Sequence, residues 1–162
     1  MNTEKRNYIE EAGLAFEKFG MTRMTGRVMG YLMICDKDAV SFDEIRDAIQ
    51  ASKGSISGTL KVLTQIGFAE PVSLPGDRKT YYRAGKASAG NLIKARLQLF
   101  DLFSGLLQKG LKLKDRQDDT SDWILELAAF YAWIGDHMLT IINSWEEEKE
   151  EVIETYRKSR NL

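Results

Sequence analysis

Hydrophobic residues recur along most of the chain at the spacing of α-helices, and short polar breaks separate these runs. The pattern predicts helices over residues 3–19 and 25–36, the second one apolar on most sides and therefore buried. A third, short amphipathic helix follows Ser41, because Ser41 and Glu44 have the spacing of a capping box ahead of an apolar run. The first half of the chain therefore begins with helices.

The next segment, SKGSISGTLKVLTQIG, predicts a fourth helix that begins after Ser52 and ends at Gly67. The only two prolines of the chain come next, and the residues around them predict two short strands, 68–73 and 80–84, joined at LPGDRK. Two helices with a tight turn, followed at once by a short hairpin, are the parts of a winged helix-turn-helix.

Long apolar helical patterns fill the second half of the chain. One covers residues 87–114, and a second begins at Thr120 or Ser121 and leads into a charged tail helix, EEEKEEVIETYRKSRNL. The pattern predicts a mainly α protein with a small β-hairpin. We expect a winged helix-turn-helix domain with an N-terminal helix in residues 1–86 and a helical dimerisation and effector region in residues 87–162.

Composition narrows the class of protein. A chain of 162 residues fits one globular domain, or a small domain with an appended segment. Its single cysteine, Cys35, cannot form an internal disulfide, which fits a reducing compartment. No apolar run reaches the roughly 18 residues of a membrane span, and the first residues do not have the pattern of a signal peptide. We therefore expect a cytoplasmic protein that does not bind membranes.

Charge is distributed unevenly along the chain. The net charge is only −1, but residues 51–95 carry seven basic and two acidic residues, whereas residues 111–154 carry twelve acidic and four basic ones. Such asymmetry suggests that one part of the protein meets an anion and the other does not. The alternative is that these are solvated faces of opposite sign.

The fourth helix has two chemically different faces. At 100° per residue, Ile56, Leu60 and Leu63 fall on one side and predict a core-facing surface. The opposite side has small, polar or basic residues and no acid: Gly54, Ser57, Gly58, Lys61 and Gln65. Carboxylates would repel phosphates, and small side chains allow a close approach to DNA, so this face predicts a recognition helix.

The tip of the hairpin has the same character. PGDRK places Arg78 and Lys79 on a turn, where Asp77 is expected to bond the turn backbone. An arginine on a wing can enter a narrow minor groove, although a lone arginine on a turn is usually just solvated. The residues predicted to bind DNA are Ser52, Lys53, Gly54, Ser55, Ser57, Gly58, Lys61, Arg78 and Lys79.

These motifs resemble those of MarR-type winged-helix regulators, and are most similar to the GbsR-like branch. The resemblance is carried by GMTRMTGRVMGYLMI, SKGSIS and PGDRKTYY, and covers residues 19–85. It implies a homodimeric transcriptional regulator, here expected to be a repressor, that binds a pseudo-palindromic operator in double-stranded DNA. Members of the family dimerise through helices at both ends of the chain. Some GbsR-like proteins respond to choline-type ligands, which implies a possible small-molecule effector.

Aromatic residues gather in the second long helix. Trp123, Phe130, Tyr131 and Trp133 could contribute to a cage for a quaternary ammonium by cation–π attraction. The more common role of such residues is in a core or a dimer interface.

Other functions have weaker support in the sequence. A winged helix can serve protein contact alone, without binding DNA, and this is the main alternative. An enzyme or a small-molecule carrier built on the aromatic helices is the other alternative. The sequence offers neither a nucleophile–base arrangement nor a metal-ligand cluster, with His137 the only histidine. We therefore expect no catalysis, no cofactor and no metal.

Overall fold

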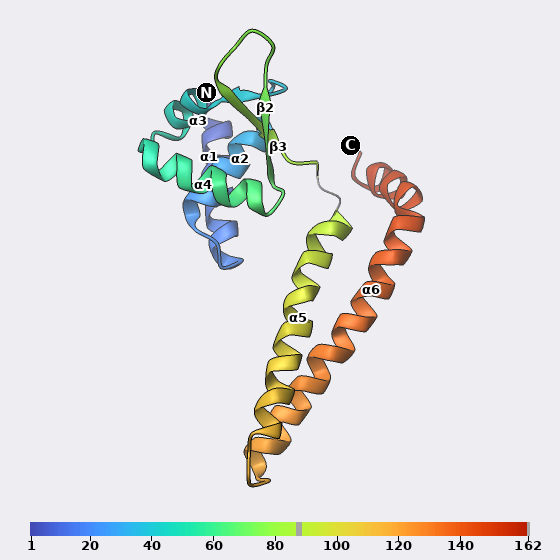
Figure 1. The fold of residues 1–162 in the computed structure, drawn as a ribbon. Helices are drawn as coiled ribbons and strands as arrows, with labels where there is room; N and C mark the ends of the chain where they lie inside the picture. The colour runs from blue at the N-terminus through green and yellow to red at the C-terminus, as the bar shows by residue number, and fades with distance from the viewer. Residues whose placement is uncertain (87–88, 162) are drawn as a thin grey trace. The chain divides into compact units, whose positions relative to one another are not determined.

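The structure, a computed structural model, describes residues 1–86 and 89–161. The chain forms two compact units, Met1–Ala87 and Ser88–Leu162 (Figure 1). The sequence-based boundary after residue 86 falls next to residues 87 and 88, which lie outside the described residues.

Helices α1 (Thr3–Lys18) and α2 (Arg23–Ile34) pack closely against each other in the first unit. A side chain at Gly26 would place its Cβ 2.4 Å from the carbonyl oxygen of Ala12, so only glycine allows this approach. The prediction that α2 is buried is confirmed for most of the helix, because six of its twelve residues are buried. Met33, at 53%, is one of its two exposed residues.

Helices α3 (Phe42–Ile49) and α4 (Lys53–Gln65) form the helix-turn-helix. The predicted capping box is confirmed: Ser41 Oγ accepts from the backbone N–H of Glu44, and the Glu44 carboxylate accepts from the N–H of Ser41. A three-residue turn follows α3. Within it, Gln50 adopts the left-handed conformation, with φ 55°, that allows so sharp a reversal.

The wing follows α4 after a Schellman-type end. Gly67 has φ +78°, and the N–H of Phe68 donates to the carbonyl of Leu63 at 2.9 Å, as the glycine stop predicts. Strands β2 (Ala69–Ser73) and β3 (Thr80–Ala84) then pair in antiparallel fashion, within a residue of the predicted bounds.

A third strand, β1 (Val40–Ser41), pairs with β3 and completes a sheet in the order β1-β3-β2. The sequence did not predict it, because two residues are too few to show an alternating pattern. The strand ties the start of α3 to the wing, because Ser41 both belongs to β1 and caps α3.

The core of the first unit draws on six of its seven helices and strands, and β3 packs partly buried side chains against it. The core consists of these buried side chains: Ile9, Val28, Met29, Leu32, Val40, Ile45, Ile49, Ile56, Leu60, Leu63 and Ala69. Because α4 supplies three of them, its orientation is fixed by the same core that holds α2 and α3 together.

The second unit is a hairpin of two long helices, α5 (Ala89–Lys112) and α6 (Asp119–Arg160), which lie side by side (Figure 1). The predicted start of α6 is wrong by one or two residues, because Asp118 caps the helix by accepting from the N–H of Ser121 at 3.0 Å. The predicted division between an apolar helix and a tail helix is also wrong. No glycine or proline follows Gly135 to interrupt the helix.

The hairpin has a narrow seam. Small residues form much of it, and the Ser104 hydroxyl donates to the carbonyl of Ala128 on α6 at 2.9 Å. Across residues 1–86 and 89–161, no helix has the length and hydropathy to cross a membrane.

Candidate nucleic-acid interface

The fourth helix directs its apolar side chains inward as predicted. Ile56, Leu60 and Leu63 are at most 2% exposed, and Thr59 lies beside them at 7%. The Ser52 hydroxyl begins the helix by accepting from the N–H of Ser55 at 3.2 Å, which confirms the predicted N-cap. The opposite face is therefore the free surface of α4.

That outward face is exposed and low in relief. It comprises Gly54, Ser57, Gly58, Lys61, Thr64 and Gln65. A Cβ built on Gly54 or Gly58 would meet nothing within 4 Å, and neither residue has a positive φ. Packing and backbone geometry therefore do not require glycine at either position, although each glycine costs the helix roughly 1 kcal/mol relative to alanine. Nothing within the described part of the chain accounts for glycine at these two positions.

A rigid turn presents the basic residues of the wing. Asp77 accepts from the N–H of Lys79 at 2.9 Å and from the Tyr81 hydroxyl at 2.7 Å, which confirms its predicted role in the turn. These bonds, that of Tyr81 first, lower the pKa of the Asp77 carboxyl. Gly76, with φ +81°, completes the bend, and Arg78 and Lys79 are exposed at its tip.

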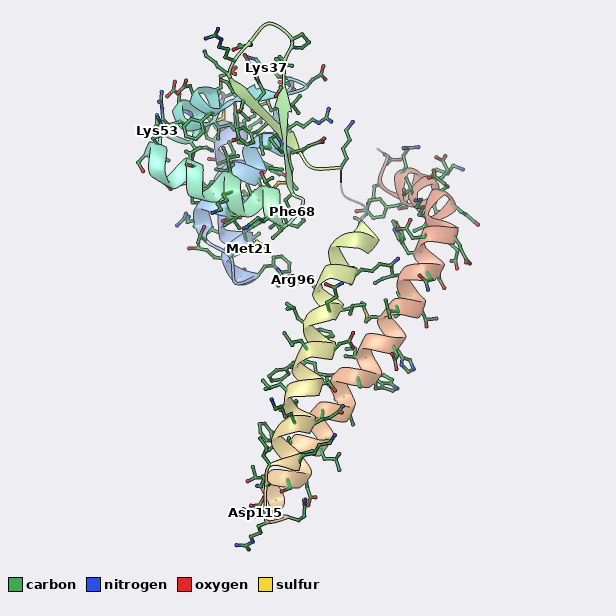
Figure 2. The ribbon with its side chains drawn as sticks, viewed as in Figure 1. Met21, Lys37, Lys53, Phe68, Arg96 and Asp115 are labelled. Carbon is green, nitrogen blue, oxygen red and sulfur yellow. The ribbon has the colours of Figure 1, made fainter. Side chains whose placement is uncertain are left out.

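Ion pairing separates the basic residues of this region into two groups. Arg83 forms an ion pair with Glu70 at 2.9 Å across β2 and β3, so its charge is locally balanced. Among the described residues, Lys53, Lys61, Arg78 and Lys79 form no ion pair. Figure 2 shows Lys53 at the exposed start of α4. The basic side chains of α4 and of the tip of the wing are therefore not ion-paired within the described part of the chain.

No model of a known protein family matches the sequence. The chain is similar to the HTH-type transcriptional regulator MmpR5 of Mycobacterium tuberculosis, at 38% identity over 99 residues. This stretch covers 59% of the chain and 60% of MmpR5, so the similarity spans less than two thirds of that relative.

Among solved structures, the chain resembles the crystal structure of a transcriptional regulator. The TM-score is 0.78 at 28% identity, over 89% of this chain and 99% of that one. These similarities agree with the winged helix-turn-helix fold of the first unit. The MarR-type family and its GbsR-like branch remain predictions.

In the first unit, the structure brings four of the residues predicted to bind DNA together on one face of α4. Gly54, Ser57, Gly58 and Lys61 share its outward face, whereas Ser55 is half-buried and Ser52 is committed to the cap. The predicted set omitted Thr64, which is exposed on the outward face beside Ser57. Its position three residues beyond Lys61, on the same side of the helix, could have identified it.

The four predicted effector residues do not converge. Of these, Phe130 and Tyr131 are in ring contact, at 5.8 Å between centroids, and Tyr131 also packs edge-to-face on Phe103 at 4.9 Å. Trp133 lies against His137 instead, at 4.2 Å, and Trp123 is 58% exposed. The rings of α6 point in several directions around the helix, as their sequence spacing requires.

Tyr131 also lines an open apolar groove on the hairpin, together with five residues of α5. The groove has a volume of about 580 Å³ and is lined by Leu99, Phe100, Leu102, Phe103, Leu106 and Tyr131. Across the described part of the chain, no group of three His, Cys, Asp or Glu residues is placed to hold a metal ion.

Proposed function

We propose that this protein is a DNA-binding transcriptional regulator, acting as a repressor in the cytoplasm. The observation that carries the proposal is the outward face of α4, where two glycines that the fold does not need lie among small polar residues and a free lysine. A surface of this kind lets the helix backbone approach base edges and phosphates closely. The names of MmpR5 and of the similar solved structure support the same function.

The proposal includes a homodimer. Two copies would place two recognition helices about one DNA turn apart, roughly 34 Å, on a pseudo-palindromic operator. The hairpin supports this assembly because several large apolar side chains are exposed on it, among them Leu102, Leu106 and Leu125, at 58–70%. Burying such side chains is a common source of dimer stability.

A small-molecule effector is part of the proposal. The exposed rings of Trp123, Phe130 and Trp133 on α6 do not form a cage within one chain, but each offers a face to which a choline-type cation can bind by cation–π attraction. Such a ligand would act by changing the spacing of the two recognition helices in the dimer. Release of bound DNA on titration with choline or betaine would test this part.

Salt-dependent DNA binding tests the central proposal. Selected genomic fragments should bind the protein with an affinity that falls as salt rises, because Lys61 and Arg78 neutralise phosphates. Lys61→Ala and Arg78→Ala should each reduce the slope of log affinity against log salt by about one unit. Lys109→Ala, which removes an exposed charge from α5, is the matched control and should leave the slope unchanged.

Two results would contradict the proposal. An unchanged slope in both variants would show that these side chains do not meet DNA. A wild-type protein that binds no fragment at any salt concentration would favour the alternative, a winged helix used only for protein contact.

A further inference from the structure

An arginine away from the outward face of α4 contacts the turn that precedes the recognition helix. Arg27, on α2, is 25% exposed, and its Nη2 donates to the backbone carbonyl of Ile49 at 3.1 Å. Ile49 is the last residue of α3, and Ser52, three residues later, caps α4. The contact therefore lies at the joint of the helix-turn-helix.

The carbonyl of Ile49 needs a donor from outside its own helix. The last carbonyls of an α-helix have no partner within the helix, and they carry the negative end of its dipole. A guanidinium matches both properties of this helix end: its N–H groups donate to the free carbonyl, and its positive charge faces the negative end of the dipole. Arg27 is thus suited to hold this end of α3 in place.

Helix α1 holds the guanidinium from the other side. Glu10 Oε1 forms an ion pair with Arg27 Nε at 2.8 Å, but the two groups are not aligned for a hydrogen bond. Glu10 also forms an ion pair with Arg23, at 3.4 Å. Gly13, one turn further along α1, leaves room for both arginine stems: a Cβ there would lie 2.9 Å from Cγ of Arg27. Residues on α1 and α2 together shape the position of this side chain.

The joint borders open space on this side. A cavity of about 350 Å³ lies beside it, and Glu10, Arg27, Ile49 and Gln50 are among its lining residues. A shorter side chain at position 27 would leave the Ile49 carbonyl facing this cavity, with no packed neighbour to replace the lost bond.

We propose that Arg27 is a positioning residue for DNA recognition: through Ile49 it fixes the end of α3, and so the point at which α4 begins. Glu10 orients its guanidinium. The expected effect of Arg27 on DNA affinity rests on the proposed function, whereas its effect on the turn before α4 is a property of the free protein. The effect on the turn and the effect on affinity can therefore be tested separately.

Amide hydrogen exchange in the free protein tests the effect on the turn. Arg27→Gln should speed exchange across residues 50–55 about tenfold, because a charge-assisted hydrogen bond at the joint is lost. Arg27→Lys keeps the charge but lacks the planar fork, and should restore part of the protection. Unchanged exchange in Arg27→Gln would overturn the proposal, whether or not the protein binds DNA.

DNA binding then separates positioning from direct contact. Arg27→Gln should bind the same fragments about tenfold more weakly, with an unchanged salt slope, and Arg27→Lys should recover part of that affinity. A slope lowered by about one unit, as expected for Lys61→Ala, would show that Arg27 touches phosphate and would overturn the proposal. Unchanged affinity would overturn it as well.

A second variant covers the case in which Arg27→Gln fails to fold. Glu10 is 44% exposed, so Glu10→Gln should fold while it loosens the guanidinium. It should speed exchange over residues 50–55 by a smaller factor than Arg27→Gln, and unchanged exchange in a folded Glu10→Gln would overturn the proposal. Glu11→Gln, on an exposed neighbour, should have no effect.

Discussion

The two units of this chain differ in how completely they bury their hydrophobic side chains. The winged helix-turn-helix closes around a cluster of buried side chains to which six helices and strands contribute. In the described part of the helical hairpin, the buried hydrophobic residues are Leu97, Ala128 and Ile142. The first unit has a core of its own, whereas two helices alone cannot cover both apolar faces and need a further surface.

The free surfaces of the two units differ in chemistry as well. The outward face of α4 is polar, acid-free and low in relief, whereas the hairpin exposes leucines and aromatic rings around an open groove. Polar faces that lack acids fit phosphates, and large apolar faces fit protein or apolar partners. The comparison indicates two separate kinds of partner, one for each unit.

The largest expected effects come from two leucine-to-alanine substitutions, one in the closed core of the first unit and one on the exposed face of the hairpin. Leu63→Ala removes a fully buried side chain and should lower the free energy of unfolding by about 2–5 kcal/mol. Leu102 is 70% exposed, so Leu102→Ala leaves no cavity within the chain. Its cost should appear only where a second copy covers the hairpin, and should therefore depend on protein concentration.

Urea denaturation at two protein concentrations, together with sedimentation, would measure both effects. Equal losses for the two variants, independent of concentration, would refute the distinction between a closed core and an incomplete one.

A negative charge added to the outward face of α4 tests whether this surface, unlike that of the hairpin, meets DNA. Gly58→Glu and Gly58→Gln both add a side chain to open space, and each should stabilise the helix by roughly 0.5–1 kcal/mol because both replace glycine. Gly58→Glu should nevertheless weaken DNA binding at least tenfold, about 1.4 kcal/mol, since its carboxylate meets phosphates. Gly58→Gln is the neutral control of matched size and should bind better than Gly58→Glu. Full affinity in Gly58→Glu would mean that this face does not meet DNA.

The smallest expected effect concerns the local stability of the first unit. Hydrogen bonds from Lys37 and then from the backbone and hydroxyl of Ser41 lower the pKa of Glu44 from its ordinary 4.5 to about 2. The charged form is therefore favoured in the folded state, so its contribution to stability is present above pH 4.5 and is lost as the pH falls towards 2.

Thermal unfolding of Glu44→Gln across this pH range would measure that contribution. The variant should be less stable than wild type by about 1 kcal/mol at pH 7, the typical value of a helix cap, and the difference should vanish near pH 2. Glu11→Gln should show no such trend. A difference that stays constant with pH would argue against the lowered pKa of Glu44.

Local signals in the sequence were sufficient for most of the first unit. Ser41 with Glu44, Ser52 and Gly67 each mark a helix end through bonds between near neighbours, so their roles can be predicted without knowing the fold. The same signals misplaced the start of α6. The sequence DRQDDTSD offers several capping residues, and local chemistry alone did not select Asp118.

Contacts between distant segments decided the rest. The pairing of β1 with β3, the ion pair of Arg83 with Glu70 and the contact of Arg27 with Ile49 join residues that are 13 or more positions apart. The ring contacts of Tyr131 likewise depend on how α5 packs against α6, and they left Trp123 and Trp133 facing elsewhere.

The sequence by itself determined the helices and helix caps of the first unit, the wing and the two faces of α4, because periodicity and capping act within a few residues of chain. The tertiary structure alone decided which cations stay unpaired, which glycines have empty space around them and which side chain holds the turn ahead of α4. These properties depend on neighbours brought together by the fold, and no local pattern records them.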